Sequence, residues 1–183
     1  MKMKFCKTCL NTNTRPGSTF TSTGLCPVCA YKNNEEENWN ERRSILDNIV
    51  VQAKKKVVGK YDCIIGVSGG KDSTRQALFV RDVLKMTPLL VCMSYPPEQV
   101  TRLGVDNLEN LINLGFDVVT IKPSPRLWRK LVKLGFYKYG NYLKACELAL
   151  FSSVPRFAIA YQIPLIWWGE NSAIQVGENS VMG

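Results

Sequence analysis

The stretch Ser68-Gly69-Gly70-Lys71-Asp72-Ser73 sets hydroxyl, ammonium and carboxylate groups around two adjacent glycines. It follows a short apolar run and precedes a run with helical spacing. Two glycines let a backbone approach a phosphate chain closely, and the N–H groups at a helix N-terminus donate to it. Asp72 would repel phosphate unless it holds a cation, so the pattern implies Mg²⁺. The predicted phosphate-binding residues are Gly66, Val67, Ser68, Gly69, Gly70, Lys71, Asp72 and Ser73.

The two commonest phosphate motifs do not fit this stretch. A Walker A loop has four residues between its glycines and a hydroxyl after its lysine. Here three residues separate Gly66 from Gly70, and Asp72 follows Lys71. The dinucleotide motif G-x-G-x-x-G fails because Ser68 stands at its second glycine. The stretch is therefore a different strand-loop-helix phosphate site.

Four of the seven cysteines form two C-x-x-C pairs. Cys6 and Cys9 are separated by sixteen residues from Cys26 and Cys29, a spacing typical of a four-thiolate zinc site. The Thr-, Gly- and Asn-rich residues between the pairs predict turns or a thin hairpin that needs the metal to fold. Four thiolates leave no position for water, which disfavours a catalytic zinc. A redox dithiol or two unrelated pairs are the alternatives.

The remaining cysteines are Cys63, Cys92 and Cys146. Cys63 and Cys92 lie inside apolar runs and are expected to be buried as small hydrophobic side chains. We expect no metal site from these three residues.

Composition limits the possible chemistry. The chain has 183 residues and no histidine, which excludes Ser-His triads, Cys-His hydrolysis and His-ligated catalytic zinc. A formal charge of +9 indicates an anionic partner: a nucleotide, a nucleic acid or an acidic surface. No run of about eighteen apolar residues occurs, so no membrane span is expected. The N-terminus lacks the apolar region of a secretory signal, so we expect a cytoplasmic protein.

Strand-like runs alternate with helical runs after residue 59. Strands are predicted over 62–67, 88–93, 117–121 and 164–168, and helices over 73–86, 99–115, 125–137 and 145–161. This alternation predicts an α/β domain with a parallel sheet covered on both faces. Ligands in such folds bind beyond the carboxyl ends of the strands, where the glycine stretch, "MSYPP" and "WWGEN" fall.

A further helix is predicted from Glu35 to about Val57, with an acidic start and a basic end that complement the helix dipole. We expect it to pack on the α/β domain, and a basic tail for nucleic acid is the alternative. The predicted divisions are 1–34 for the metal site, 35–58 for a linker helix and 59–183 for the α/β domain.

The glycine stretch resembles the PP-loop signature S-G-G-x-D-S of the ATP pyrophosphatases, which split ATP between its α and β phosphates. With "CPVCA" in a leading zinc ribbon, "VSGGKDS" and the late "ACELALFSSVPRFAIAYQIPLIWWGEN", nearly the whole chain resembles the N-acetyl sugar amidotransferases of bacterial surface-polysaccharide synthesis, which includes lipopolysaccharide O-antigen. The resemblance implies a Rossmann-like PP-loop domain and a transferase or ligase that converts the acetamido group of a nucleotide-linked sugar into an acetamidino group. It implies ATP, Mg²⁺ and structural Zn²⁺, with ammonia supplied by a glutaminase through a cyclase-like subunit.

The resemblance also implies roles for single residues. Lys71 and Asp72 would act on the departing pyrophosphate. Adenine would lie against Met93 and Ser94, at the end of the second strand, held largely by backbone groups. Gly169 and Glu170, after the fourth strand, would face the α-phosphate, where Glu170 could orient Mg²⁺ or the acceptor amide.

Two departures from that family stand out. Its members continue beyond "VGENSVMG", so a truncated form lacking part of the acceptor site is expected. Gly-Glu-Asn-Ser occurs at 169–172 and again at 177–180, which we interpret as coincidence.

Two other functions stay open. Basic and aromatic residues alternate between Lys122 and Lys144, which suits a tRNA-modifying thiolase, a nucleotide sugar, or a helix with a solvated basic face. Thiolases of the PP-loop group carry a second C-x-x-C, but here Ala149 stands three residues after Cys146, which favours the sugar. The third possibility is a non-catalytic zinc-ribbon protein that binds a nucleotide.

Overall fold

The computed structural model describes residues 2–14, 18–34 and 38–170. These form two compact units, one comprising Met1–Arg42 with Glu170, the other Arg43–Gly169. The boundary falls within helix α2 (Trp39–Lys55). The finer division at residues 34 and 58 stays a prediction.

The described part of the first unit consists of short turns and irregular segments followed by helix. An antiparallel bridge joins Phe5 to Thr12, and helix α1 (Pro27–Asn34) begins directly after Cys26. Its buried apolar cluster contains three cysteines, with Phe20, Leu25 and Val28 packed against them. So small a core stabilises a fold weakly, which is why units of this kind depend on a metal.

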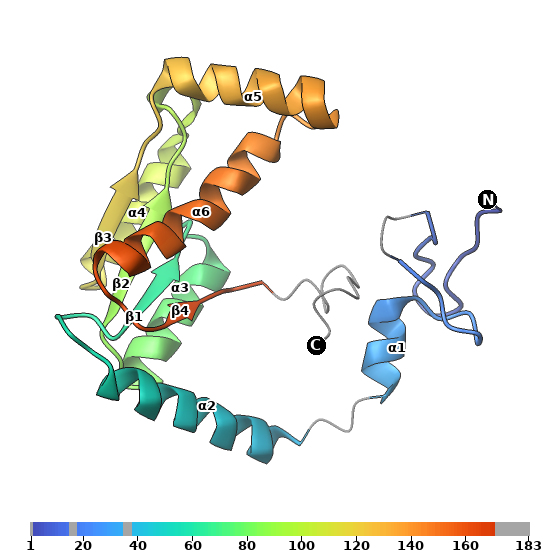
Figure 1. Ribbon diagram of the computed structural model, residues 1–183, viewed down its shortest axis with the longest axis horizontal. Coiled ribbons are helices and arrows are strands. Elements are labelled where there is room, and N and C mark those ends of the chain that lie inside the picture. The colour runs from blue at the N-terminus through green and yellow to red at the C-terminus, as the bar shows by residue number, and fades with distance from the viewer. Residues whose placement is uncertain (1, 15–17, 35–37, 171–183) are drawn as a thin grey trace. The chain divides into compact units, whose positions relative to one another are not determined.

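The second unit is built on a four-stranded parallel sheet (Figure 1). Its strands are β1 (Cys63–Gly66), β2 (Pro88–Met93), β3 (Asp117–Ile121) and β4 (Ile166–Trp167), in the order β3-β2-β1-β4. The predicted α/β class is confirmed. The chain moves outward from β1 to β3 and then returns to the other side of β1. The carboxyl ends of β1 and β4 therefore flank the point where the strand order reverses, the usual ligand crevice of such sheets.

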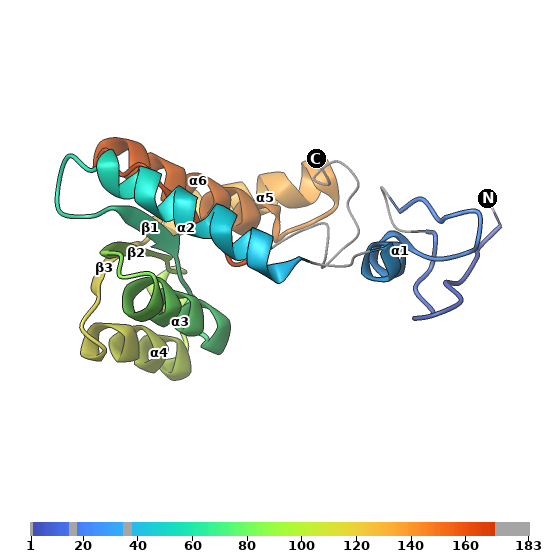
Figure 2. The ribbon, with the colours of Figure 1, turned by 90° about the horizontal axis from the view of Figure 1, so that it is seen from below.

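Side chains alternate between the two faces of the sheet along each strand, so each face packs into its own hydrophobic core. Cys63, Ile65 and Leu90 pack with helix α3 (Lys71–Leu78), whereas Ile64 and Leu89 pack with helix α6 (Lys144–Ala160). Figure 2 shows α3 and helix α4 (Arg102–Asn113) on one side of the sheet and α6 on the other. The predicted cover on both faces is thus confirmed.

Helix ends follow local chemistry. Thr101 Oγ1 accepts from the Gly104 N–H and starts α4, after a 3₁₀ turn at Pro97–Gln99. Ser124 caps helix α5 (Pro125–Tyr139) in the same way, and Gly140 ends it in the left-handed region at φ +64°. No helix in the described part of the chain is long and apolar enough to cross a membrane.

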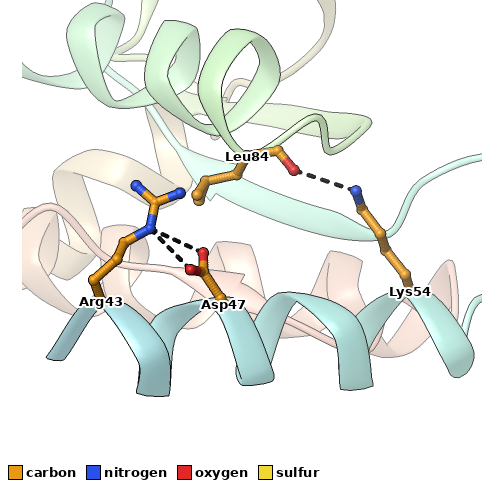
Figure 3. A network of polar contacts seen from close by, with 4 residues as sticks. All are labelled: Arg43, Asp47, Lys54 and Leu84. Atoms are coloured by element: carbon orange, nitrogen blue, oxygen red, sulfur yellow. Dashed lines mark hydrogen bonds and ion pairs between the residues drawn. The ribbon is translucent and has the colours of Figure 1, made fainter. Parts of the chain in front are cut away.

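Helix α3 is held in place from its far end. It continues into a π-helical turn, Phe79–Val83, after which Lys54 Nζ donates to the Leu84 carbonyl at 3.2 Å (Figure 3). The same Nζ also donates to the Lys85 carbonyl at 2.7 Å. Val50 and Ala53 of α2 are buried in the core beside α3, as predicted for a packed linker helix. A cation at the carbonyl end of a helix also suits its dipole.

Candidate functional site

Residues 67–70 turn the chain from β1 into α3 at the switch point of the sheet. The Val67 N–H donates to the Val91 carbonyl at 2.9 Å, which ties the start of the turn to β2. Gly70 is the N-cap of α3 in extended conformation, and no side chain among the described residues accepts from the first N–H groups of the helix. Those donors are therefore available to an anion. We call residues 68–73 the phosphate loop.

Gly69 is the residue that the loop geometry requires to be glycine. Its φ is +77°, and a Cβ there would lie 2.6 Å from the carbonyl oxygen of Asn107. The backbone of α4 therefore packs directly on the loop. Only glycine satisfies both the conformation and the contact.

The hydroxyls near the loop are partly used to hold its shape. Ser73 Oγ donates to the Gly70 carbonyl at 3.1 Å, and Thr74 Oγ1 donates to the Gly69 carbonyl at 3.3 Å. Sequence reasoning assigned Ser73 to phosphate and missed Thr74, because a helical hydroxyl reaching back to a loop carbonyl leaves no pattern in the sequence. Ser68 is exposed, and its Oγ accepts from the Gly70 N–H at 3.4 Å.

Lys71 and Asp72 begin α3 with exposed side chains. Neither forms a hydrogen bond or ion pair with another described residue. A free carboxylate is the ligand type that Mg²⁺ takes, so Asp72 fits the predicted metal role. Lys71, the residue before it in the chain, adds a positive charge to the start of α3.

Two contacts fix the neighbouring strand ends to the loop region. A Cβ on Gly66 would lie 2.9 Å from Val154 Cγ2, so α6 packs closely on the end of β1. Gln76 Nε2 donates to the Trp168 carbonyl at 2.9 Å, which joins α3 to the end of β4. Gly169 is the next residue, and a Cβ built on it would lie 3.4 Å from Gln76 Oε1. Helix α3, which begins at the phosphate loop, therefore contacts the turn after β4, and the predicted role of Gly169 at the α-phosphate stays a prediction.

Met93 and Ser94 end β2 at the same edge of the sheet. Met93 is buried, and the Ser94 N–H donates to the Ile121 carbonyl at 2.9 Å, so that group is committed to the sheet. Ser94 Oγ is 3.4 Å from the Tyr95 carbonyl. Their contact with adenine stays a prediction. Glu170 is exposed and belongs to the other unit, so its predicted role also stays a prediction.

Cys63, Cys92 and Cys146 are all buried, which confirms the expectation for Cys63 and Cys92. Burial raises the pKa of each thiol. Cys146 packs with Met93 and Trp128 near the end of β2. Neutral, buried thiols make poor sulfur carriers.

In the first unit the four predicted ligands converge. The sulfurs of Cys6, Cys9, Cys26 and Cys29 all lie within 4.8 Å of one another, and those of Cys9 and Cys26 are 3.5 Å apart. A tetrahedral ion with Zn–S bonds near 2.3 Å separates its sulfurs by about 3.8 Å. The cluster fits zinc.

Backbone N–H donors lower the pKa of one of these thiols, whereas a neighbouring thiol and burial raise the pKa of another. The N–H groups of Cys26 and Cys9 lower the pKa of Cys6 to about 6. Hydrogen bonding to Cys9, followed by burial, raises the pKa of Cys29 to about 12. Four thiolates this close repel one another, so full ionisation requires a cation among them.

Comparisons with known proteins bear on the fold. No known family model matches the chain. An uncharacterized protein of Methanocaldococcus jannaschii is 25% identical over 107 residues, 58% of this chain and 38% of its own. The NH3-dependent NAD synthetase from Campylobacter jejuni, solved with a nitrate ion, has a TM-score of 0.51 and 15% identity over 77% of this chain and 61% of its own. The glutamine-dependent NAD+ synthetase from Acinetobacter baumannii has a TM-score of 0.49 and 17% identity, over 72% of this chain and 25% of its own.

The likeness to the Campylobacter jejuni enzyme shows the fold of this chain. It is the α/β fold of that synthetase, built here on a parallel four-stranded sheet, which confirms the fold class predicted from the alternation of strands and helices. The chain spans 38% of the archaeal relative and 61% of the NAD synthetase, so it matches less than two thirds of either.

Proposed function

We propose that the protein is an ATP-pyrophosphatase-type amidotransferase that turns the acetamido group of a nucleotide-linked sugar into an acetamidino group. The observation that carries this proposal is the phosphate loop itself. Its S-G-G-x-D-S sequence lies between β1 and α3 at the switch point, with Gly69 pressed against α4 and free N–H donors at the start of α3. That arrangement suits the β and γ phosphates of ATP.

Ammonia is the proposed nucleophile. A solved protein with a similar fold is named an NH3-dependent NAD synthetase, and we extend that use of ammonia to this chain. In our proposal a glutaminase releases the ammonia and a cyclase-like subunit delivers it.

The proposed reaction has two steps. The acetamido oxygen attacks the α-phosphorus of ATP, the bond from that phosphorus to the bridging oxygen breaks, and pyrophosphate leaves. The amide N–H proton is lost to the departing pyrophosphate in this step, and the resulting neutral imidate carries AMP on the former carbonyl oxygen. Ammonia adds to the imidate carbon, and AMP then departs with that oxygen. The product is a protonated acetamidine, so the proton that ammonia would otherwise release stays on it.

The residues at the loop suit the first step. Charge builds on the leaving pyrophosphate, and Lys71 with the α3 N–H groups would stabilise it. Asp72 would hold Mg²⁺, which supplies additional positive charge at the phosphates when bound. No step requires an imidazole, in agreement with a chain that has no histidine.

The test measures pyrophosphate release from ATP with ammonium chloride and UDP-linked acetamido sugars. We expect release that depends on the sugar, formation of AMP, and exchange of the acetamido oxygen for nitrogen in the product by mass spectrometry. If ATP binds but no acetamido acceptor supports pyrophosphate release, the result would instead favour the non-catalytic nucleotide-binding protein.

One observation keeps the tRNA-modifying alternative in view. Helix α5 has five basic residues and no acidic one: Arg126, Arg129, Lys130, Lys133 and Lys138. Such a face suits phosphate contacts. However, Cys146 is buried and its raised pKa keeps the thiol neutral, which disfavours sulfur transfer there. Tight, salt-dependent tRNA binding together with tRNA-stimulated pyrophosphate release would support the alternative.

A further inference from the structure

A groove of about 700 Å³ lies between α5 and α6 in the second unit. The two helices meet at the Gly140 turn, and α6 continues across the sheet (Figure 1). Met93 and Ile121, the last residues of β2 and β3, contribute to the wall of the groove. The groove therefore opens at the same edge of the sheet as the phosphate loop. Its volume is typical of small-molecule sites.

The walls of the groove are apolar, and several of their side chains are exposed to solvent. On α5, Leu127, Leu131 and Leu134 recur at helical spacing and are 52%, 38% and 58% exposed. Leu148 faces them from α6 and is 57% exposed. Aliphatic side chains gain free energy when an apolar ligand removes them from water. The groove is therefore suited to an apolar chain.

The charged residues that line the groove are all cations. Lys144 is paired with Glu147 at 2.7 Å. Arg156 and Lys138 form no ion pair or hydrogen bond with other residues in the described part of the chain, and they lie on different helices. An uncompensated cation beside an apolar surface favours an amphipathic anion.

The polar groups of the groove do not suit a nucleoside. Its two serine hydroxyls already donate to their own helix, Ser152 to the Ala149 carbonyl and Ser153 to the Leu150 carbonyl. No Asn, Gln, Asp or Glu is among the described residues that line it. Apart from its cations and the Tyr139 hydroxyl, the described lining offers no free side-chain donor to a ribose or a base, so most of their polar groups would lose water without gaining partners, which is unfavourable.

We propose that the α5–α6 groove binds a prenyl chain whose diphosphate head is held by Arg156. On the premise of the proposed function, an acetamido sugar carried on a prenyl diphosphate would be a second acceptor beside the nucleotide-linked sugar. The position agrees with this role, because Ser153 lines the groove and its neighbour Val154 packs against Gly66, directly before the phosphate loop. A sugar attached to the head could thus reach the ATP site.

Binding of farnesyl diphosphate to the full chain, measured by calorimetry below its critical micelle concentration, tests the groove. A saturating non-hydrolysable ATP analogue blocks the phosphate loop, while inorganic diphosphate and UDP serve as probes without the chain. We expect farnesyl diphosphate to bind at least about tenfold more tightly than either probe, because only it buries the leucines. Arg156→Gln and Leu134→Gln should each raise its Kd about tenfold.

Matched controls lie on the same helices outside the groove. Arg129→Gln on α5 and Ile159→Gln on α6 change an exposed cation and an exposed aliphatic side chain, and should leave the Kd unchanged. Thermal unfolding of all four variants checks that they fold. Equal Kd values for farnesyl diphosphate and inorganic diphosphate, or equal effects of groove and control variants, would overturn the proposal.

The acceptor role has a separate readout from binding. We expect a prenyl-diphosphate-linked acetamido sugar to support pyrophosphate release from ATP. Arg156→Gln should reduce this activity by raising KM for the sugar more than by lowering kcat. Release with UDP-linked sugars alone would overturn the prenyl acceptor and leave the amidotransferase intact. If farnesyl diphosphate binds tightly but no acceptor supports pyrophosphate release from ATP, the result would support the groove as a binding site and overturn the proposed function.

Discussion

The Gly69 backbone lies against the Asn107 backbone, so that a Cβ on Gly69 would be 2.6 Å from the Asn107 carbonyl oxygen. The two residues belong to different connections of the sheet, one to the turn after β1 and the other to α4. Their contact means that the shape of the phosphate loop depends on the position of α4 as well as on its own sequence.

Gly69→Ala is therefore expected to destabilise the protein by more than the cost of a left-handed alanine. That conformational cost is about 1–2 kcal/mol, and the backbone contact with Asn107 adds to it. Gly115→Ala is the matched control, because Gly115 has φ +86° with nothing within 4 Å of its Cβ position. Urea unfolding of both variants isolates the contact, and equal losses of stability would show that α4 does not restrain the loop.

Asp72→Ala should abolish ATP turnover while zinc content and thermal stability stay unchanged, because the exposed carboxylate supports neither core. If Asp72 acts on the leaving pyrophosphate, the loss should appear in kcat more than in ATP affinity, since the charge develops in the transition state. Asp106→Ala, an exposed carboxylate on α4, is the control. Wild-type pyrophosphate release from Asp72→Ala, with the partner proteins and an accepted acetamido sugar, would refute the mechanism.

The zinc site predicts one zinc ion per chain, bound by the first unit. Cys26→Ser should remove the ion, because three thiolates and a hydroxyl bind zinc much more weakly than four thiolates. Cys146→Ala removes a cysteine outside the cluster and should retain one zinc. Metal analysis of protein purified without chelator measures both. Equal zinc loss in the two variants, or a disulfide between the C-x-x-C pairs in reduced lysate, would contradict the assignment.

Local sequence signals were sufficient for the sheet and for the convergence of the four cysteines, whereas the ligand of the phosphate loop stays a prediction. The strands at 88–93 and 117–121 were predicted at their observed bounds, because each is a short apolar run between turn residues. β4 is shorter than predicted, at Ile166–Trp167 instead of 164–168, since Pro164 has no N–H to pair. The cysteine cluster followed from spacing alone, because each C-x-x-C turn directs two sulfurs to one point.

Contacts between distant segments could not be predicted in this way. Gln76 and Trp168 are 92 residues apart, and nothing in either neighbourhood indicates their hydrogen bond. The π-helical turn at Phe79–Val83 also has no sequence signal, because its apolar spacing matches that of an α-helix. The α5–α6 groove depends on the angle between two helices, which each helix's own pattern does not specify.

Gln76→Met tests whether the bond to Trp168 positions the β4 turn. The change removes the donor to the Trp168 carbonyl and also the buried Oε1, which has no partner among the described residues. These effects oppose each other, so we expect stability to change by less than about 1 kcal/mol. Pyrophosphate release should nevertheless fall about tenfold, since a misplaced turn weakens alignment at the α-phosphate. Gln52→Met on α2 is the control, and a large stability loss with unchanged turnover per folded molecule would assign Gln76 a structural role only.

The Lys60–Asp117 pair predicts a stability change with pH at the opposite edge of the sheet. Hydrogen bonds from Lys60 and then Tyr61 lower the pKa of Asp117 below its ordinary value. A lowered pKa in the folded state gives stability that is present above the unfolded pKa, about 3.9, and is lost as the pH falls through the folded pKa. Asp117→Asn should therefore reduce the free energy of unfolding at pH 7 more than at pH 3.

The expected difference is small, because the two side chains are 64% and 52% exposed and salt screens such pairs. Urea unfolding of the wild type and Asp117→Asn at both pH values, in low salt and in about 1 M NaCl, measures it. Asp106→Asn removes an exposed carboxylate that has no salt bridge in the described structure and is the control for the loss of one negative charge. If Asp117→Asn lowers stability equally at pH 7 and pH 3, or equally in low and high salt, its contribution is packing at the start of β3 and not the ion pair.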